Sequence, residues 1–159
     1  MTPAETIEAA NSMLEDFEES KALPKIEKPR DQDYLEKLIN SSREERAKMS
    51  PSDCDDAAIS LASYSVYVNR VTQAEEASAK IAASNVAREI AEPLKDVRAY
   101  NWEERKLVAI GASFKATAFH KLQIQHETRV VRLKDLSKLL NELARYFGAS
   151  AYGKRKHYD

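Results

Sequence analysis

The chain has 159 residues, of which 43% are hydrophobic and 32% are charged, and it contains only three glycines. This length suits one domain, and the composition favours an elongated helical protein over a β-sandwich or a barrel. The formal net charge of −1 conceals a gradient. Residues 1–56 carry 15 acids and 8 bases (net −7), whereas residues 97–159 carry 6 acids and 13 bases (net +7). The asymmetry indicates either that the basic end binds a polyanion or that the two ends attract each other.

The N-terminal part of the chain reads as two short helices joined by a linker. Residues 2–20 are expected to be helical, because Thr2 can cap the helix and a proline and a glutamate follow at the favoured positions. Residues 21–30 contain two prolines and are interpreted as the linker. A second helix is expected over residues 31–48. Residues 1–49 would form an acidic helical arm that packs on its own chain or docks on a neighbouring subunit.

A long third helix is predicted from Ser50 and Pro51 to Ile90, and residues 91–100 are expected to form a short break and turn. One face of this helix carries mostly small or apolar side chains at helical spacing, which suits close packing against another helix. These seam positions are Ala58, Leu61, Ser65, Val68, Thr72, Glu75, Ala79, Ala82 or Ala83, Val86 and Ile90.

The longest predicted helix runs from Asn101 to Phe147, and Gly148 is expected to end it. Four leucines and a phenylalanine repeat in it at spacings of 3, 4, 3 and 4 residues, as in a coiled-coil seam. They are Leu133, Leu136, Leu140, Leu143 and Phe147. The same repeat continues backwards through Val108, Ala112, Lys115, Phe119, Leu122, His126 and Arg129.

Two long helices on either side of a short turn predict an antiparallel α-hairpin over residues 50–148. Four polar side chains lie on its seams and could fix the register: Glu75, Lys115, His126 and Arg129. Apolar residues beside the second seam, Ile110, Ile124 and Val131, are expected to stay uncovered in an isolated hairpin. We therefore expect a homo-oligomer.

Residues 149–159 are interpreted as an exposed basic aromatic tail. It contains Tyr152, Lys154, Arg155, Lys156 and Tyr158. Lysine and arginine attract phosphates and tyrosine rings stack on unpaired bases, so this mixture suits single-stranded nucleic acid. Lys134, Lys138 and Arg145 share one helical face and would extend the basic surface from the tail. Basic tails also serve as solvated ends or as contacts to acidic partners.

Other chemistry has little support in the sequence. The single cysteine, Cys54, fits a reducing compartment, and carboxylates beside it make it a poor nucleophile. The three histidines lack metal-ligand spacing, and no phosphate-binding glycine loop or nucleophile motif occurs. No secretory leader or membrane-spanning run is evident. We expect a cytoplasmic protein that is not an enzyme and needs no cofactor, metal or membrane.

Three stretches carry a family resemblance over roughly residues 55–148: YSVYVNR at 64–70, WEER at 102–105 and RVVRLKDLSKLL at 129–140. In helical layout and in these positions the chain resembles the small helical phage proteins grouped with the recombination mediator UvsY. The resemblance implies a helical-hairpin protomer that assembles into a ring, binds single-stranded DNA and helps to load a strand-exchange recombinase. Phosphate contacts would come from lysines and arginines, here Lys134, Lys138, Arg145 and the bases of the tail. The acidic N-terminal arm and the near-neutral net charge depart from that pattern.

The sequence thus predicts an all-α oligomer that acts as a single-stranded-DNA-binding recombination accessory protein, in the host cytoplasm if it is viral. The alternative is a virion structural or assembly protein, such as an adaptor, scaffold or capsid component. In that case the acidic arm and the basic C-terminal half would join neighbouring subunits. A coiled-coil adaptor with protein partners alone is a third hypothesis.

Overall fold

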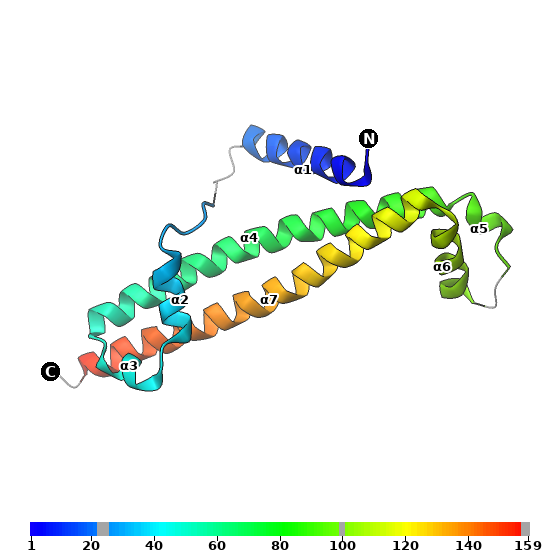
Figure 1. The fold of residues 1–159 in the computed structure, drawn as a ribbon. Coiled ribbons are helices and arrows are strands. Elements are labelled where there is room, and N and C mark those ends of the chain that lie inside the picture. The colour runs from blue at the N-terminus through cyan, green and yellow to red at the C-terminus, as the bar shows by residue number, and fades with distance from the viewer. Residues whose placement is uncertain (22–25, 99–100, 157–159) are drawn as a thin grey trace. The chain divides into compact units, whose positions relative to one another are not determined.

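The computed structural model of the protein describes residues 1–21, 26–98 and 101–156, and these form seven helices and no strand (Figure 1). The helices are α1 (Pro3–Ser20), α2 (Gln32–Asn40), α3 (Arg43–Lys48), α4 (Pro51–Ile90), α5 (Pro93–Asp96), α6 (Trp102–Ala112) and α7 (Phe114–Arg155). The chain divides into two compact units. Unit 1 comprises Met1–Pro24 and Thr72–Val131, and unit 2 comprises Lys25–Val71 and Arg132–Asp159. The long helices α4 and α7 contribute to both units.

Helices α4 and α7 pack against each other in antiparallel directions (Figure 1). In unit 2, the Cys54 Sγ lies 4.0 Å from the Ser150 Oγ, and the Ser65 Oγ lies 3.0 Å from the Ser137 Oγ. Residue numbers on α7 therefore fall as those on α4 rise. The predicted all-α class and the pairing of two long helices are confirmed.

The buried face of α4 follows the predicted seam closely. Leu61 and Val68 are buried in the core of unit 2, and Ala82, Val86 and Ile90 are buried in unit 1. The unit 2 core adds Leu35 and Leu38 of α2 and Leu140, Phe147 and Ala151 of α7. Ser50 caps α4, since its Oγ accepts a hydrogen bond from the Asp53 backbone N–H. Hydrogen bonds from the Ser50 hydroxyl and N–H lower the pKa of Asp53 and keep its carboxylate charged at the positive end of the helix.

The N-terminal helices agree with the prediction at the start of α1 and differ from it in the second helix. Thr2 and Glu5 form the expected capping box at α1. The single helix expected over residues 31–48 is instead two helices, because Ser41 is extended and Ser42 starts α3 with a second capping box. A serine hydroxyl offers the backbone N–H groups an alternative partner, which favours a new helix start over a continuous helix. The predicted linker lies partly outside the described residues.

The predicted helix from Asn101 to Phe147 is also interrupted, which corrects the expectation of one continuous helix. α6 ends at Ala112, Ser113 is extended, and α7 begins at Phe114. The Ser113 Oγ accepts a hydrogen bond from the Ala116 N–H at 3.2 Å, and Thr117 Oγ1 donates to the Ile110 carbonyl at 2.9 Å. These side chains satisfy the backbone groups that the break leaves unpaired.

The break changes which side chains are buried around α6. Ala109 and Ile110 are buried with Val86, Ile90, Ala116 and Phe119 in the core of unit 1. Val108, predicted to lie on the seam, is 52% exposed, and Lys115 is exposed as well. The backward extension of the seam is therefore wrong at α6, and so is the expectation that Ile110 is uncovered.

Gly148 does not end the last helix. α7 continues to Arg155, and Ala151 is buried in the core of unit 2. Residues 149–155 thus continue the helix and do not form the separate exposed tail that was expected, because Ala151 continues the apolar face of the helix. Residues 1–49 likewise form no unit of their own, since α1 belongs to unit 1 and α2 and α3 belong to unit 2.

Candidate nucleic-acid interface

The three basic residues predicted on one face of α7 lie together in unit 2. Lys134, Lys138 and Arg145 are exposed and line an open groove of about 450 Å³. The other lining residues are Asn69, Ser137, Asn141 and Glu142. Positions 134, 138 and 145 are 4 and 7 residues apart, so their side chains project on the same side of the helix. This agrees with the shared face expected from the sequence.

Polar contacts between α4 and α7 form one edge of this groove. The Ser137 Oγ donates a hydrogen bond to the Asn69 Oδ1 at 2.7 Å and lies 3.0 Å from the Ser65 Oγ. Ser65 and Ser137 are both buried. Because Asn69 uses its oxygen for Ser137, its amide nitrogen remains a donor for a ligand in the groove. Sequence reasoning missed Asn69, because its position beside the lysines depends on the pairing of the two helices.

The continuation of α7 extends the basic face. Tyr152 and Lys156 are 18 and 22 residues beyond Lys134, which corresponds to five and six helical turns, so both lie nearly in line with it. Lys156 is the first residue after α7, and its backbone N–H donates a hydrogen bond of 3.4 Å to the Tyr152 carbonyl. The Tyr152 ring is 63% exposed, and the Lys156 Nζ lies 4.8 Å from its centroid. We call the line of Lys134, Lys138, Arg145, Tyr152 and Lys156 the basic face of α7.

Two other predicted residues, Lys154 and Arg155, make structural contacts. The Lys154 Nζ donates to three carbonyls, those of Arg46 and Ala47 at 3.1 Å and that of Met49. These carbonyls end α3, where a cation complements the helix dipole. Arg155 forms an ion pair with Asp55 near the start of α4. Both residues therefore belong to α7 and not to a free tail; Lys154 is partly buried, whereas Arg155 is exposed as expected. The last predicted residue, Tyr158, lies outside the described residues.

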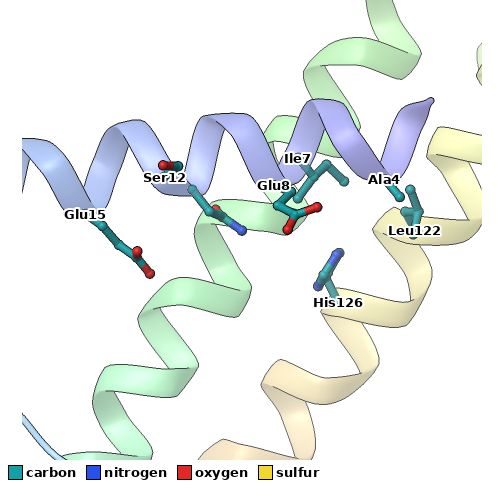
Figure 2. A pocket seen from close by; sticks show the side chains of 8 residues that line it. Ala4, Ile7, Glu8, Ser12, Glu15, Leu122 and His126 are labelled. Atoms are coloured by element: carbon teal, nitrogen blue, oxygen red, sulfur yellow. The ribbon is translucent and has the colours of Figure 1, made fainter. Parts of the chain in front are cut away.

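A second groove, of about 550 Å³, lies between α1 and α7 in unit 1 (Figure 2). Its lining residues are Ala4, Ile7, Glu8, Asn11, Ser12, Glu15, Leu122 and His126. Figure 2 shows Glu8 and His126 on opposite sides of it. The carboxylates of Glu8 and Glu15 would repel phosphate, so this groove is unsuited to a nucleic-acid backbone.

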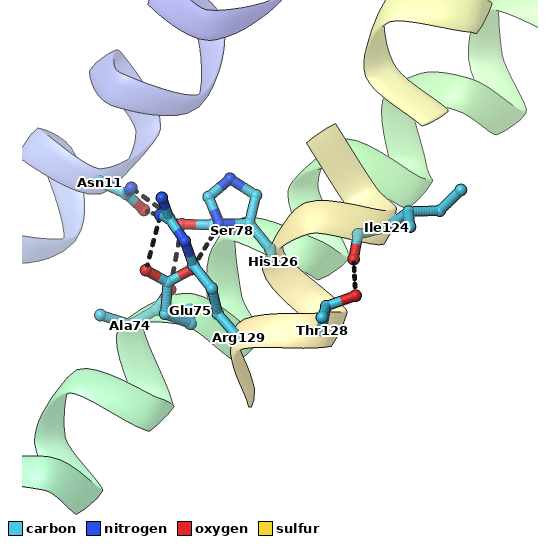
Figure 3. A network of polar contacts seen from close by, with 8 residues as sticks. All are labelled: Asn11, Ala74, Glu75, Ser78, Ile124, His126, Thr128 and Arg129. Carbon is cyan, nitrogen blue, oxygen red and sulfur yellow. Dashed lines mark hydrogen bonds and ion pairs between the residues drawn. The ribbon is translucent and has the colours of Figure 1, made fainter. Parts of the chain in front are cut away.

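A polar network connects α4 and α7 beside this groove (Figure 3). The Glu75 carboxylate lies 2.6 Å from the His126 Nδ1 and 3.3 Å from an Arg129 guanidinium nitrogen. Nearby, the Asn11 Nδ2 of α1 donates to the Ser78 Oγ at 3.0 Å. Three of the four predicted polar seam residues thus meet, and Lys115 does not. The side chains of Glu75 and His126 are only 18% and 15% exposed, so their contact suits a role in fixing the pairing of the helices.

Within the described residues, no group of three or more histidine, cysteine, aspartate or glutamate side chains is placed to hold a metal ion. None of the helices in this part of the chain combines the length and the apolar character that crossing a membrane requires.

Comparisons of the chain with models of protein families, with curated proteins and with solved structures found no match. The resemblance to the UvsY group therefore stays a prediction that rests on the quoted residues.

We expect Lys154→Ala to lower the free energy of unfolding by about 1–2 kcal/mol, because the carbonyls at the end of α3 lose a charged donor. Lys156→Ala is the matched control, since Lys156 is exposed, and it should change stability by less than about 0.5 kcal/mol. Urea unfolding followed by circular dichroism measures both values. Equal stability of the two variants would contradict the structural role of Lys154.

A double-mutant cycle of Glu75→Ala and His126→Ala should give a coupling energy of about 1 kcal/mol or more, because the two side chains are largely buried and hydrogen-bonded. The exposed pair Gln123 and Glu127, with a hydrogen bond of 2.8 Å, is the control and should give about 0.2–0.5 kcal/mol. Urea unfolding at neutral pH provides the four stabilities of each cycle. Coupling at Glu75 no larger than in the control would mean that the network does not fix the helix pairing.

Proposed function

We propose that the protein binds single-stranded nucleic acid, and specifically DNA, through the basic face of α7. The observation that carries this proposal is the alignment of three basic side chains and an exposed tyrosine on one side of the continuous helix α7, with Lys156 in the turn just after its end. From Lys134 to Lys156 this face extends about 33 Å at 1.5 Å per residue. Cations spaced along such a line can contact successive phosphates and release their counterions.

The kind of nucleic acid follows from the other groups on this face. The ring of Tyr152 is 63% exposed and offers a surface on which an unpaired base can stack. The groove beside the lysines combines the amides of Asn69 and Asn141 with the carboxylate of Glu142. Amides and carboxylates donate to or accept from the edges of bases, which a single strand exposes. In a duplex, the Watson–Crick edges of the bases are used for pairing and their faces are stacked on one another.

The near-neutral net charge of the chain is compatible with this proposal because the exposed line of side chains on α7 is itself basic. α1 contains six acids and no base, and it belongs to unit 1, whereas the basic face belongs to unit 2. In unit 2, a strand along α7 would meet Lys134, Lys138 and Arg145, with the carboxylate of Glu142 beside them. Local charge, more than net charge, governs phosphate binding at short range.

We further propose the biological role of this binding: the protein is a recombination accessory protein of a phage, a mediator-like homo-oligomer that helps to load a recombinase. It rests on the resemblance of residues 55–148 to the UvsY group.

A second candidate function is that of a virion structural or assembly protein. The observation that favours it is exposed apolar surface on α4 in unit 2, where Ile59 is 65% and Val66 is 50% exposed. These residues are seven apart, so they lie on one face and could pack against another protein subunit. Indifference of the protein to oligonucleotides, together with assembly into large particles, would favour this candidate.

Lys138→Ala and Arg145→Ala should each weaken binding of a fluorescent single-stranded oligonucleotide by several-fold, because each removes a phosphate contact. The slope of log affinity against log salt should also fall by about 0.7 for each substitution. Fluorescence anisotropy at several salt concentrations measures both quantities. The control is Lys121→Ala, on α7 in unit 1, which should bind like the unsubstituted protein. Unchanged binding by both basic-face variants would refute the proposed interface.

Tyr152→Ala should weaken binding of the same oligonucleotide by about fivefold to a hundredfold, the range expected for one lost stacking contact. Tyr152→Phe keeps the ring and should retain most of the affinity. A duplex of the same sequence, used as a competitor, should displace the single strand poorly. Equal losses in the alanine and phenylalanine variants would show that the ring does not stack on a base.

A further inference from the structure

The groove beside the lysines of α7 contains hydrogen-bonding groups that phosphate binding alone does not explain. Lys134, Lys138 and Arg145 supply its cations, and Asn69 and Glu142 also line it. A carboxylate repels a phosphate group, so Glu142 lowers the affinity of the groove for a nucleic-acid backbone. The same carboxylate accepts hydrogen bonds from the N–H groups of a base. Asn69 and Glu142 therefore indicate a contact with a base.

The amide of Asn69 is oriented by a chain of hydrogen bonds between α4 and α7. The Ser137 hydroxyl donates to the Asn69 Oδ1 at 2.7 Å, and the Ser65 Oγ lies 3.0 Å from the Ser137 Oγ. Ser65 and Ser137 are buried, which strengthens these bonds, whereas Asn69 itself is exposed. Since its oxygen is engaged, Asn69 offers the groove the two N–H donors of its amide.

Glu142 has the complementary character, because an ionised carboxylate accepts hydrogen bonds at both of its oxygens. It is exposed on α7, five residues beyond Ser137. Five residues correspond to about 140° around a helix, so Glu142 and Ser137 lie toward different sides of the groove. Asn69, which is bonded to Ser137, thus places donors toward one side, and Glu142 places two acceptors toward the other.

The four bases differ in how well they match this arrangement. At its Watson–Crick edge, guanine carries one acceptor, O6, beside two adjacent donors, N1–H and the N2 amino group. O6 can accept from Asn69, and the two donors match the two carboxylate oxygens of Glu142. Adenine and cytosine each have one amino donor on that edge, and thymine has one N–H between two carbonyls. Each of these three bases leaves one carboxylate oxygen without a partner on the base.

We propose that this groove is a guanine-selective base site, in which Asn69 donates to O6 and Glu142 accepts from N1–H and the N2 amino group. The proposal rests on the binding of single-stranded DNA by the basic face of α7 and adds a base preference to it. Lys138 and Arg145 contact the phosphates that flank the guanine. Hydrogen bonds from guanine offset the repulsion between Glu142 and these phosphates, and the other bases offset it less.

Fluorescence anisotropy with three short oligonucleotides tests the base preference. One is oligothymidine, the second carries a single central guanine, and the third carries inosine in its place, which lacks only the N2 amino group. The guanine strand should bind about fivefold or more tightly than oligothymidine. Inosine should lose most of this gain, because it offers Glu142 one donor fewer. Equal affinity for the guanine and inosine strands would overturn the proposal.

Two variants separate recognition of the base from the effect of charge. Glu142→Gln removes one acceptor together with the charge, so the ratio of guanine to inosine affinity should fall toward one even if both affinities rise. Asp135→Asn is the matched control, since it removes a charge from an exposed position of α7 outside the groove lining, and it should keep the ratio. An unchanged ratio in Glu142→Gln would show that Glu142 acts through its charge alone, which contradicts the proposal.

Asn69→Ala tests the other side of the site. It should reduce the preference for the guanine strand over oligothymidine, because O6 loses its donor, and circular dichroism establishes that each variant is folded. Salt-sensitive binding that is equal for all three strands would overturn the guanine site and leave the proposed function of α7 standing. A protein that binds none of the strands would overturn both.

Discussion

The structure depends on the burial of one face of α4 against α7. In unit 2 this contact buries Leu61, Leu140 and Phe147, and α2 adds to the same core. Apolar burial supplies most of the stabilisation but tolerates sliding of one helix along the other. Polar pairs oppose that sliding, because Ser65 with Ser137 and Glu75 with His126 would lose their buried partners in another register.

The same packing determines which face of α7 remains exposed. Leu140, Phe147 and Ala151 turn one side of the helix into the unit 2 core. Lys134, Lys138, Arg145, Tyr152 and Lys156 consequently share the exposed side. The line reaches Tyr152 because α7 continues through Gly148 to Arg155. The C-terminal end is fixed further by Lys154 on the end of α3 and by Arg155 on Asp55.

The interruption at Ser113 changes which side chains are buried at the start of the predicted helix. Side chains that a continuous seam would bury, such as Val108, are turned to solvent, while Ala109 and Ile110 enter the core. Hydrogen bonds to the side chains of Ser113 and Thr117 satisfy backbone groups at the break, which lowers its free-energy cost. The break thus leaves Leu107 and Val108 of α6 exposed.

The sequence by itself determined the helical class, the extent of α4, the seam of α4 and the shared face of Lys134, Lys138 and Arg145. Each of these follows from helical periodicity and from capping residues such as Ser50, which act within a few positions along the chain. Only the tertiary structure decided that Asn69 lines the lysine groove, that Lys154 is a structural cap and that α7 passes Gly148. The physical reason is that these outcomes depend on contacts between residues far apart in the sequence, where burial outweighs local propensity.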